Sequence, residues 1–169
     1  MKNVQQNIYF LAQEERFKRR LDLNATFLSM GLQESSIRYN YPPHRQEEYE
    51  FIYIVDGVLR YFCDEEEFEV KAGDCYFISP GQVHEEHSIS EPLSFYYLKF
   101  NLYDYRGNKI DRLTFDKSKQ VFHDIGPYMK SLFEKVYLES SNKFHGYQQI
   151  VENTIIEILI NIERYLGPE

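Results

Sequence analysis

The chain has 169 residues, a net charge of −8, and 43% hydrophobic and 17% aromatic residues. This length fits one domain with a core of its own, and the composition excludes a disordered chain. The negative charge argues against contact between this chain and a nucleic-acid phosphate backbone, because that contact needs clustered Lys and Arg. Any role in nucleic-acid binding would therefore need a separate domain.

The two cysteines, Cys63 and Cys75, have neither CxxC nor CxxH spacing. This pattern is typical of reduced, buried thiols in a cytoplasmic protein, although it does not exclude a disulfide between them. The apolar run at residues 8–12 is interrupted at once by charges, so it is not a signal sequence. The run "IIEILI" near the C-terminus is too short to span a membrane. We therefore expect a cytoplasmic location.

Residues 1–24 give the weakest local signals of the chain. The stretch "YFLAQEERFKRRLDL" has loosely helical spacing, whereas "ATFLSMGLQ", which begins at residue 25, is typical of an extended segment. We interpret residues 1–24 as an N-terminal arm.

Between Tyr39 and about Leu102, short aromatic and β-branched runs alternate with turn residues. These runs are "YEFIYIV", "VLRYFC", "EFEVK", "CYFIS" and "LSFYYLKFNL", and they predict β-strands. Apolar residues occur on both faces of the runs, which indicates strands that are covered on both sides, as in a small barrel. We therefore expect a mainly β domain with a barrel over residues 25–122.

From Asp124 onward the apolar residues follow a helical period. The stretch "GPYMKSLFEKVYLES" predicts one helix, with Gly126-Pro127 at its start. A second helix of about 20 residues is predicted from Tyr147 to Leu166, because Gly167-Pro168 end it. Residues 123–169 are thus expected to form a two-helix C-terminal segment.

The second predicted helix carries an apolar pair outside its main apolar stripe. Ile156 and Ile160 are spaced i, i+4 and are bordered by polar residues. Either the first helix or the arm covers them, or they form a helix-to-helix contact in a symmetric dimer. We expect a homodimer through the C-terminal helices.

Polar side chains gather at the start of the first barrel strand, in "PPHRQEEYEFIYIVDG". If this strand is regular, His44, Gln46 and Glu50 point to one face, since alternate residues of a strand share a face. His84 follows a Pro-Gly turn at the start of another strand. The sequence therefore predicts a group of polar side chains at one end of an apolar wall.

The spacing of these residues resembles the two sequence motifs of the cupin superfamily. The resemblance implies a jelly-roll barrel with Gly57 and Gly73 at turns and with His44, Gln46, Glu50 and His84 lining the interior. The residues that carry it are His44-x-Gln46-xxx-Glu50, then Gly57, Gly73-Asp74 and Pro80-Gly81-xx-His84.

The order of elements is similar to that of the sensor domain of AraC-type transcription regulators. A single cupin barrel with "YEFIYIVDGVLRYF", "VKAGDCYFISPGQVH" and "YYLKF" precedes two helices, over about residues 25 to 166. In that family the barrel binds a small effector, the helices form a dimer, and a separate helix-turn-helix domain binds DNA. The resemblance implies that DNA is bound only through a domain absent from this chain, which ends at Glu169.

A metal site is the alternative interpretation of the polar residues. Cupin enzymes with three His and one Glu hold Fe, Mn, Ni or Zn. Gln46 replaces one of these imidazoles by an amide, which favours recognition over metal binding. We therefore expect no cofactor, while a small metal-dependent cupin enzyme, such as a dioxygenase or sugar isomerase with His44, Gln46, Glu50 and His84 at its metal, remains the alternative.

The resemblance implies a metal-free pocket for a sugar or a small acid, in a domain that is not an enzyme. Binding would act by a shift between populations of conformers, with the N-terminal arm as the candidate moving element. Arg45 would hold a carboxylate or hydroxyls if the two prolines before it turn it inward. The strand pattern does not decide between Tyr96 and Tyr97, because the register is unknown. The candidate ligand-binding residues are His44, Arg45, Gln46, Glu50, Tyr61, His84 and Tyr96.

Overall fold

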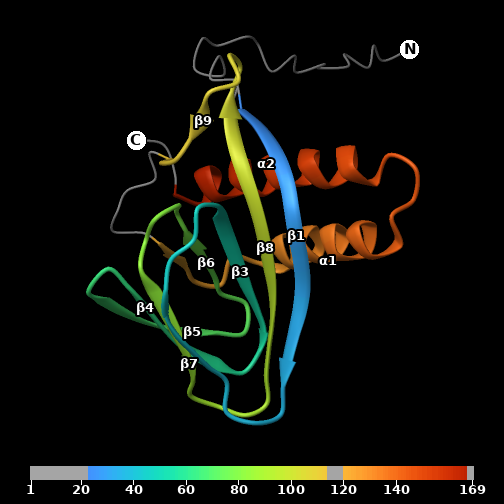
Figure 1. Ribbon diagram of the computed structural model, residues 1–169. Helices are drawn as coiled ribbons and strands as arrows, with labels where there is room; N and C mark the ends of the chain where they lie inside the picture. The colour runs from blue at the N-terminus through green and yellow to red at the C-terminus, as the bar shows by residue number, and fades with distance from the viewer. Residues whose placement is uncertain (1–22, 114–119, 167–169) are drawn as a thin grey trace, which may run out of the picture.

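Two antiparallel β-sheets face each other, and two helices pack on the outer side of the larger sheet (Figure 1). The computed structural model describes residues 23–113 and 120–166. The arm expected at residues 1–24 lies outside these residues except for its last two, which begin the first strand. This architecture confirms the expected fold class, a β-barrel followed by two C-terminal helices.

The larger sheet has the strand order β1-β8-β3-β6-β10, and β9 pairs with Leu102 and Tyr103 near the C-terminal end of β8. The "ATFLSMGLQ" stretch is part of β1, as its extended pattern predicted. β1 and β8 pair along almost their whole length, with a bulge between Phe27 and Ser29. The strands of this sheet are β1 (Leu23–Ser35), β3 (Tyr49–Asp56), β6 (Cys75–Ile78), β8 (Leu93–Asp104), β9 (Lys109–Ile110) and β10 (Val121–Phe122).

The smaller sheet has the order β2-β7-β4-β5 and closes the opposite side of the barrel. Two tight turns flank its strand β4, one at Gly57 and one at Asp64 and Glu65. Gly57, between β3 and β4, has a φ of +87°, and a Cβ there would meet the carbonyl oxygen of Pro92 at 2.5 Å, so the turn requires glycine. Asp64 and Glu65 form the tip between β4 and β5. The strands are β2 (Asn40–His44), β4 (Val58–Cys63), β5 (Glu66–Lys71) and β7 (His84–Ser88).

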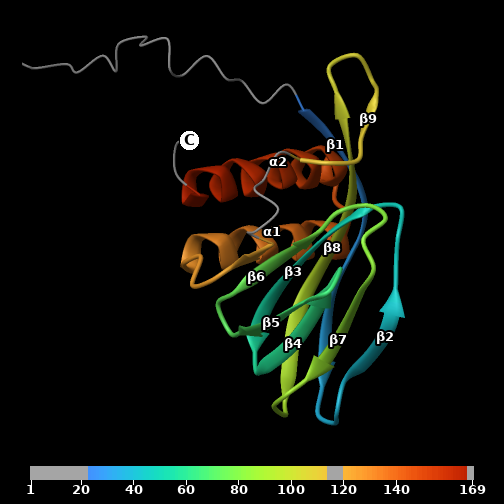
Figure 2. The same ribbon diagram turned by 90° about the vertical axis from the view of Figure 1, so that its left-hand side faces the viewer.

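The helices are α1 (Pro127–Asn142) and α2 (Tyr147–Leu166). α1 begins at the predicted Gly-Pro pair, with Pro127 in its first turn, and Lys143 in a left-handed conformation ends it. Figure 2 shows both helices on the face of the larger sheet that points away from the smaller sheet. Neither helix has the length and apolar character needed to cross a membrane.

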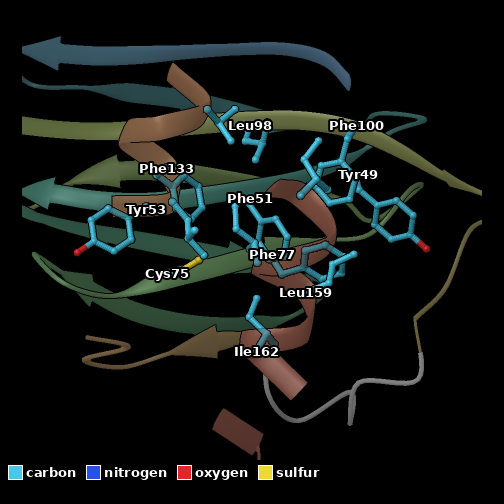
Figure 3. Close-up of a cluster of buried hydrophobic side chains, with 14 of the residues drawn as sticks. Tyr49, Phe51, Tyr53, Cys75, Phe77, Leu98, Phe100, Phe133, Leu159 and Ile162 are labelled. Carbon is cyan, nitrogen blue, oxygen red and sulfur yellow. The ribbon is translucent and has the colours of Figure 1, made fainter. Parts of the chain in front are cut away.

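The larger sheet is buried on both faces, as the mixed pattern of its strands predicted. We call the face toward the smaller sheet the inner face and the face toward the helices the outer face. On the outer face, Phe51 and Phe77 pack against Phe133 of α1 and Leu159 of α2 (Figure 3). On the inner face, Ile52 and Ile54 join a second apolar cluster between the sheets.

One local prediction was wrong. The stretch from His44 to Glu50 is not a regular strand, because β2 ends at His44 and β3 begins at Tyr49. The residues between them, 45–48, leave the strand conformation and cross from the smaller sheet to the larger one. His44 and Glu50 therefore belong to opposite sheets, and alternation along one strand is not what brings them together.

Candidate functional site

A cavity of about 330 Å³ lies between the two sheets. Its wall combines β1, β3 and β8 of the larger sheet with β2 and β7 of the smaller one. Ile52 and Phe95 give it an apolar part, where it borders the cluster between the sheets. The side chains on which its chemistry depends are Tyr39, His44, Glu50, Glu86, Tyr97 and Lys99.

A chain of hydrogen bonds links Lys99 to Glu50 at one side of the cavity. The Lys99 ammonium donates to Gln46 Oε1 at 2.8 Å, and Gln46 Nε2 donates to Glu50 Oε2 at 2.9 Å. Lys99 Nζ also lies 3.5 Å from Glu48 Oε1 and 4.0 Å from Glu50 Oε2. Burial raises the pKa of Glu50, although Lys99 and Gln46 oppose this effect. Lys99 is thus already engaged with acidic and amide oxygens on its own side.

Glu86 of β7 enters the cavity from the opposite sheet, with 5% of its surface exposed. Its described hydrogen bond is a long one, in which the Tyr76 hydroxyl donates to Oε1 at 3.4 Å. Burial, and next the charge of Glu50, raise the pKa of Glu86 to about 8. Near neutral pH this carboxyl is therefore largely protonated, so it can donate as well as accept a hydrogen bond.

Two histidines meet where β2 pairs with β7. His44 is directly opposite His84 in the register, and their ring centroids are 4.0 Å apart. His84 Nδ1 lies 3.2 Å from the Gln82 carbonyl oxygen, so Nδ1 carries the proton and Nε2 is left as an acceptor. Nε2 is buried without a hydrogen-bond partner and lies 4.0 Å from Glu86 Oε1. Burial lowers the pKa of His84 to about 4, so it is neutral at physiological pH.

Tyr97 forms part of the cavity wall because a glycine lies beneath it. Gly31 of β1 is the register partner of Tyr97, and a Cβ on Gly31 would lie 2.5 to 2.6 Å from the Tyr97 ring and hydroxyl. Ser29 and Gln33, two residues to either side of Gly31, also line the cavity. The glycine therefore allows the ring to lie flat over β1, and it leaves the space of the cavity open.

A sequence model of the family described as the AraC-like ligand binding domain matches residues 28–145, which include every wall residue of the cavity. The chain belongs to this family. No curated protein gives a significant match to the sequence.

Among solved structures, part of this AraC-like domain is similar to part of several proteins. Salicylate 1,2-dioxygenase from Pseudaminobacter salicylatoxidans is 18% identical, with 41% of this chain and 21% of that chain covered and a TM-score of 0.39. Oxalate decarboxylase from Bacillus subtilis is 16% identical, with coverages of 64% and 26% and a TM-score of 0.39. KdgF from Halomonas sp. is 12% identical, with coverages of 48% and 82% and a TM-score of 0.38.

These likenesses are partial. The matched part of the AraC-like domain spans 21% of the dioxygenase chain and 26% of the decarboxylase chain. The activities of those enzymes therefore say nothing about an activity of this chain.

The AraC-like domain brings only some of the candidate residues to its cavity. His44 and Glu50 line the wall, and His84 lies behind His44. Gln46 is buried next to the wall and supports Glu50 and Lys99. His44, Gln46, Glu50 and His84 are thus close in space, although β2, the following loop, β3 and β7 supply them separately.

Three other candidates lie away from the cavity wall. Arg45 is exposed, so the prolines before it do not turn it inward. Tyr61 is fully buried in the cluster between the sheets, where it stacks on Tyr76 at 4.2 Å. Tyr96 points to the outer face and packs near Tyr137 of α1, with ring centroids 5.5 Å apart. The β8 register places its neighbour Tyr97 on the inner face instead.

Lys99 and Glu86, two of the ionisable side chains in the cavity wall, were not among the residues predicted from sequence. Lys99 shares the inner face of β8 with Phe95 and Tyr97, and Glu86 follows His84 by two residues on β7. Both are at positions where period two predicts an inward side chain once the register is known. An ionisable residue at an inward position of a barrel strand is unusual, and this feature could have indicated both residues as candidates.

The polar group does not fit a metal ion. Lys99 places its ammonium 2.8 Å from the Gln46 oxygen and 4.0 Å from Glu50, where a metal would need those oxygens as ligands. Within residues 23–113 and 120–166, no three His, Cys, Asp or Glu side chains are grouped to hold a metal. Cys63 and Cys75 are both free, buried thiols on opposite faces of the barrel wall.

Proposed function

We propose that this chain is the sensing domain of an AraC-type transcription regulator and that a small polar effector binds in the cavity between the sheets. One observation carries the proposal: polar groups from both sheets converge on a cavity of about 330 Å³ in a domain of this family. A cavity that combines an apolar part with a few convergent polar groups is typical of a small-molecule site.

In this proposal the cavity binds its effector without a metal and without a chemical reaction. The ammonium of Lys99 supplies the positive charge that a metal would otherwise give to Gln46 and Glu50. His84 is neutral and lies beneath His44, which suits it to accept a hydrogen bond rather than to bind a cation. Both features support recognition of a ligand over catalysis.

The signal would pass from the cavity to the helices through β1. Ser29 of β1 lines the cavity, and the bulge beside it leaves the Phe27 amide to donate to Glu152 Oε1 of α2 at 3.3 Å. A ligand that holds Ser29 in one position therefore favours one placement of β1 against α2. Such a ligand shifts the population of conformers only by its difference in affinity between them.

The regulator would act as a cytoplasmic homodimer, with DNA bound by a further domain. Ile156 and Ile160 of α2 are both partly buried, and Ile156 also packs against the outer-face core. Their remaining exposed surface would form the centre of a symmetric contact. The double substitution Ile156→Glu, Ile160→Glu, followed by mass measurement in solution, tests this contact, and an unchanged dimer mass would remove it.

A thermal-shift screen of sugars and small acids tests effector binding. A ligand at about 100 times its dissociation constant stabilises the folded state by about 2.7 kcal/mol. The substitutions Glu50→Ala and His84→Ala should each remove the shift of the best ligand while the domain stays folded, whereas Arg45→Ala, an exposed control, should keep it. If Glu50→Ala and His84→Ala both keep the full shift, the ligand binds elsewhere. Transition metal bound in equimolar amount after purification without chelator would favour a cupin enzyme instead.

A further inference from the structure

The cavity contains two buried carboxyl groups on opposite sheets. Glu50 projects from β3 and Glu86 from β7, with 7% and 5% of their surfaces exposed. Both line the cavity, and the charge of Glu50 is, after burial, the second cause of the raised pKa of Glu86. Acidic side chains this deeply buried are rare unless a positive charge compensates them.

Glu50 has such a charge within ion-pair distance, whereas Glu86 feels the charge of Lys99 only from farther away. Lys99 lies 4.0 Å from Glu50 Oε2 and also contacts Gln46 and Glu48. For Glu86, no ion pair with Lys or Arg exists among the described residues, and the imidazole 4.0 Å away is neutral. Glu86 is therefore a buried acidic side chain in the cavity wall that lacks a cationic partner.

A second observation at the same place concerns hydrogen bonds. His84 Nε2 is buried without a hydrogen-bond partner beside Glu86 Oε1. A buried acceptor without a donor destabilises the folded state, because it loses the hydrogen bond to water that it makes when exposed. His84 itself lies behind the wall, so a ligand with several N–H donors would bind Glu86, the wall residue next to this acceptor.

Aromatic rings border the same space. Tyr39 and Tyr97 line the cavity together with both carboxyls, and the charges of Glu86 and Glu50 add to burial in raising the pKa of Tyr39. The faces of tyrosine rings attract cations, and their hydroxyls hydrogen-bond polar groups. The wall thus offers ring faces and hydroxyls next to an uncompensated acid.

We propose that the effector is a small amine with one protonated nitrogen, seated between Glu50 and Glu86, and with hydroxyl groups that bind the tyrosines. Once Glu86 ionises, two carboxylates face one lysine in the cavity wall, and one ammonium group supplies the missing positive charge. The inference rests on the proposed effector binding and narrows it, because it excludes the small acids.

In the free domain Glu86 holds a proton near neutral pH, since its pKa is raised to about 8. When an ammonium group enters, Glu86 ionises and releases that proton to solvent, while the ligand keeps its own. Binding of such an amine near neutral pH therefore releases up to one proton, and the affinity rises with pH until Glu86 is ionised in the free domain.

The test uses sets of three small molecules that share one carbon skeleton and carry a positive charge, no charge or a negative charge. D-glucosamine, D-glucose and D-glucuronate form one set, and ethanolamine, ethylene glycol and glycolate form another. Titration calorimetry in two buffers of different ionisation enthalpy gives both the affinity and the protons released. In at least one set the amine should bind tenfold or more tightly than its neutral and acidic partners, with release of part of a proton per ligand at pH 7.

The variant Glu86→Gln keeps the size and removes the charge, and Glu85→Gln on the same strand is its control, since Glu85 is absent from the wall of this cavity. Glu86→Gln should weaken amine binding about tenfold and abolish the proton release, whereas Glu85→Gln should change neither. The inference is wrong if no amine binds more tightly than its partners, or if Glu86→Gln binds the amine as the wild type does.

The two proposals fail in different ways. If a sugar or an acid binds tightly and Glu50→Ala abolishes this binding, the proposal of an amine effector is wrong, while the proposal of effector binding in the cavity is supported. Tight binding of an amine that neither Glu50→Ala nor Glu86→Gln affects would place the site elsewhere and overturn both.

Discussion

The two faces of β8 differ in chemistry although they belong to one strand. On the outer face, Tyr96, Leu98 and Phe100 pack against the helices in a continuous apolar core. On the inner face, Tyr97 and Lys99 line the cavity opposite the smaller sheet. The outer face therefore stabilises the fold. The inner face borders a cavity with polar groups, and these features do not contribute to the stability of the apolar core.

In this domain the residues that stabilise the fold and the residues proposed to bind the effector lie on different faces of the larger sheet. The outer-face cluster buries Phe51, Phe77 and Phe133 almost completely, and burial of each such side chain contributes about 1.5–3 kcal/mol. Opposite the inner face, β7 of the smaller sheet holds Glu86 and His84, whose burial disfavours their charged forms. Changes on the outer face should therefore act on folding, and changes on the inner face should act on binding and on pH dependence.

The largest effect is expected on the outer face. Phe133 of α1 is fully buried, with its ring centroid 5.4 Å from that of Tyr53 and 6.3 Å from that of Phe51. Phe133→Ala should lower the free energy of unfolding by about 3–5 kcal/mol, measured by urea titration, because it leaves a cavity in the core. Leu138→Ala on the exposed side of α1 is the control and should cost far less. A loss below about 1 kcal/mol would contradict the role of this face.

An intermediate effect is expected at Glu86, and it depends on pH. The folded-state pKa of about 8 lies above the ordinary value near 4.3, so the native state keeps a proton that the unfolded chain releases. The corresponding stabilisation is complete below about pH 4.3 and is lost as pH rises through about 8.

The matched variants expose this loss. Between pH 5 and pH 8 the wild type should lose roughly 3 kcal/mol of stability relative to Glu86→Gln, which has no proton to lose. Chemical denaturation at several pH values measures the difference, with Glu85→Gln following the wild type. A parallel pH dependence of wild type and Glu86→Gln would show that Glu86 ionises freely.

The smallest effect on stability, and a clear effect on binding, is expected at Gly31. Its φ lies outside the left-handed region, so the backbone tolerates alanine, but the added Cβ displaces the Tyr97 ring toward the cavity. Gly31→Ala should weaken effector binding about tenfold, or about 1.4 kcal/mol, in calorimetric titration. Leu28→Ala, at the exposed bulge of the same strand, should leave the affinity unchanged. If Gly31→Ala binds the effector with the affinity of the wild type, Tyr97 does not contribute to the binding site.

A further pair of substitutions compares the two faces at adjacent residues. Tyr97→Phe removes a hydroxyl from the cavity wall, whereas Tyr96→Phe removes one from the outer face. Tyr97→Phe should weaken effector binding about fivefold, since one hydrogen bond contributes roughly 1 kcal/mol. Tyr96→Phe should bind with the affinity of the wild type in the same titration. A loss of affinity in Tyr96→Phe alone would reverse the assignment of the faces.

The fold could be predicted from sequence because its signals are local. Gly126-Pro127 and the apolar period predicted both helices, and Gly57 predicted the turn after β3. The pairing of strands is not local, so the sequence could not decide between Tyr96 and Tyr97. It also treated His44 to Glu50 as one strand, because the change of sheet at residues 45–48 carries no Gly signal.

The site was predicted in part for the same reason. His44, Gln46, Glu50 and His84 follow recognisable spacing, and they do lie together. Glu86 and Lys99 lie on the consecutive strands β7 and β8, which belong to different sheets, and only the register of each strand brings its side chain to the cavity. Arg45 was expected inside if the two prolines before it turned the chain inward, yet it is exposed in the loop after β2.

The separation of the two faces can be tested directly by NMR of aromatic rings. We would titrate the tightest ligand of the probe sets into protein with labelled Tyr and Phe side chains and assign the rings by substitution. We expect the signals of the cavity rings to shift in proportion to ligand bound, namely those of Tyr39, Phe95 and Tyr97. The signals of Tyr96 and Phe133, on the outer face, should change little. Larger shifts at Tyr96 and Phe133 than at the cavity rings would contradict the central claim that the effector binds between the sheets.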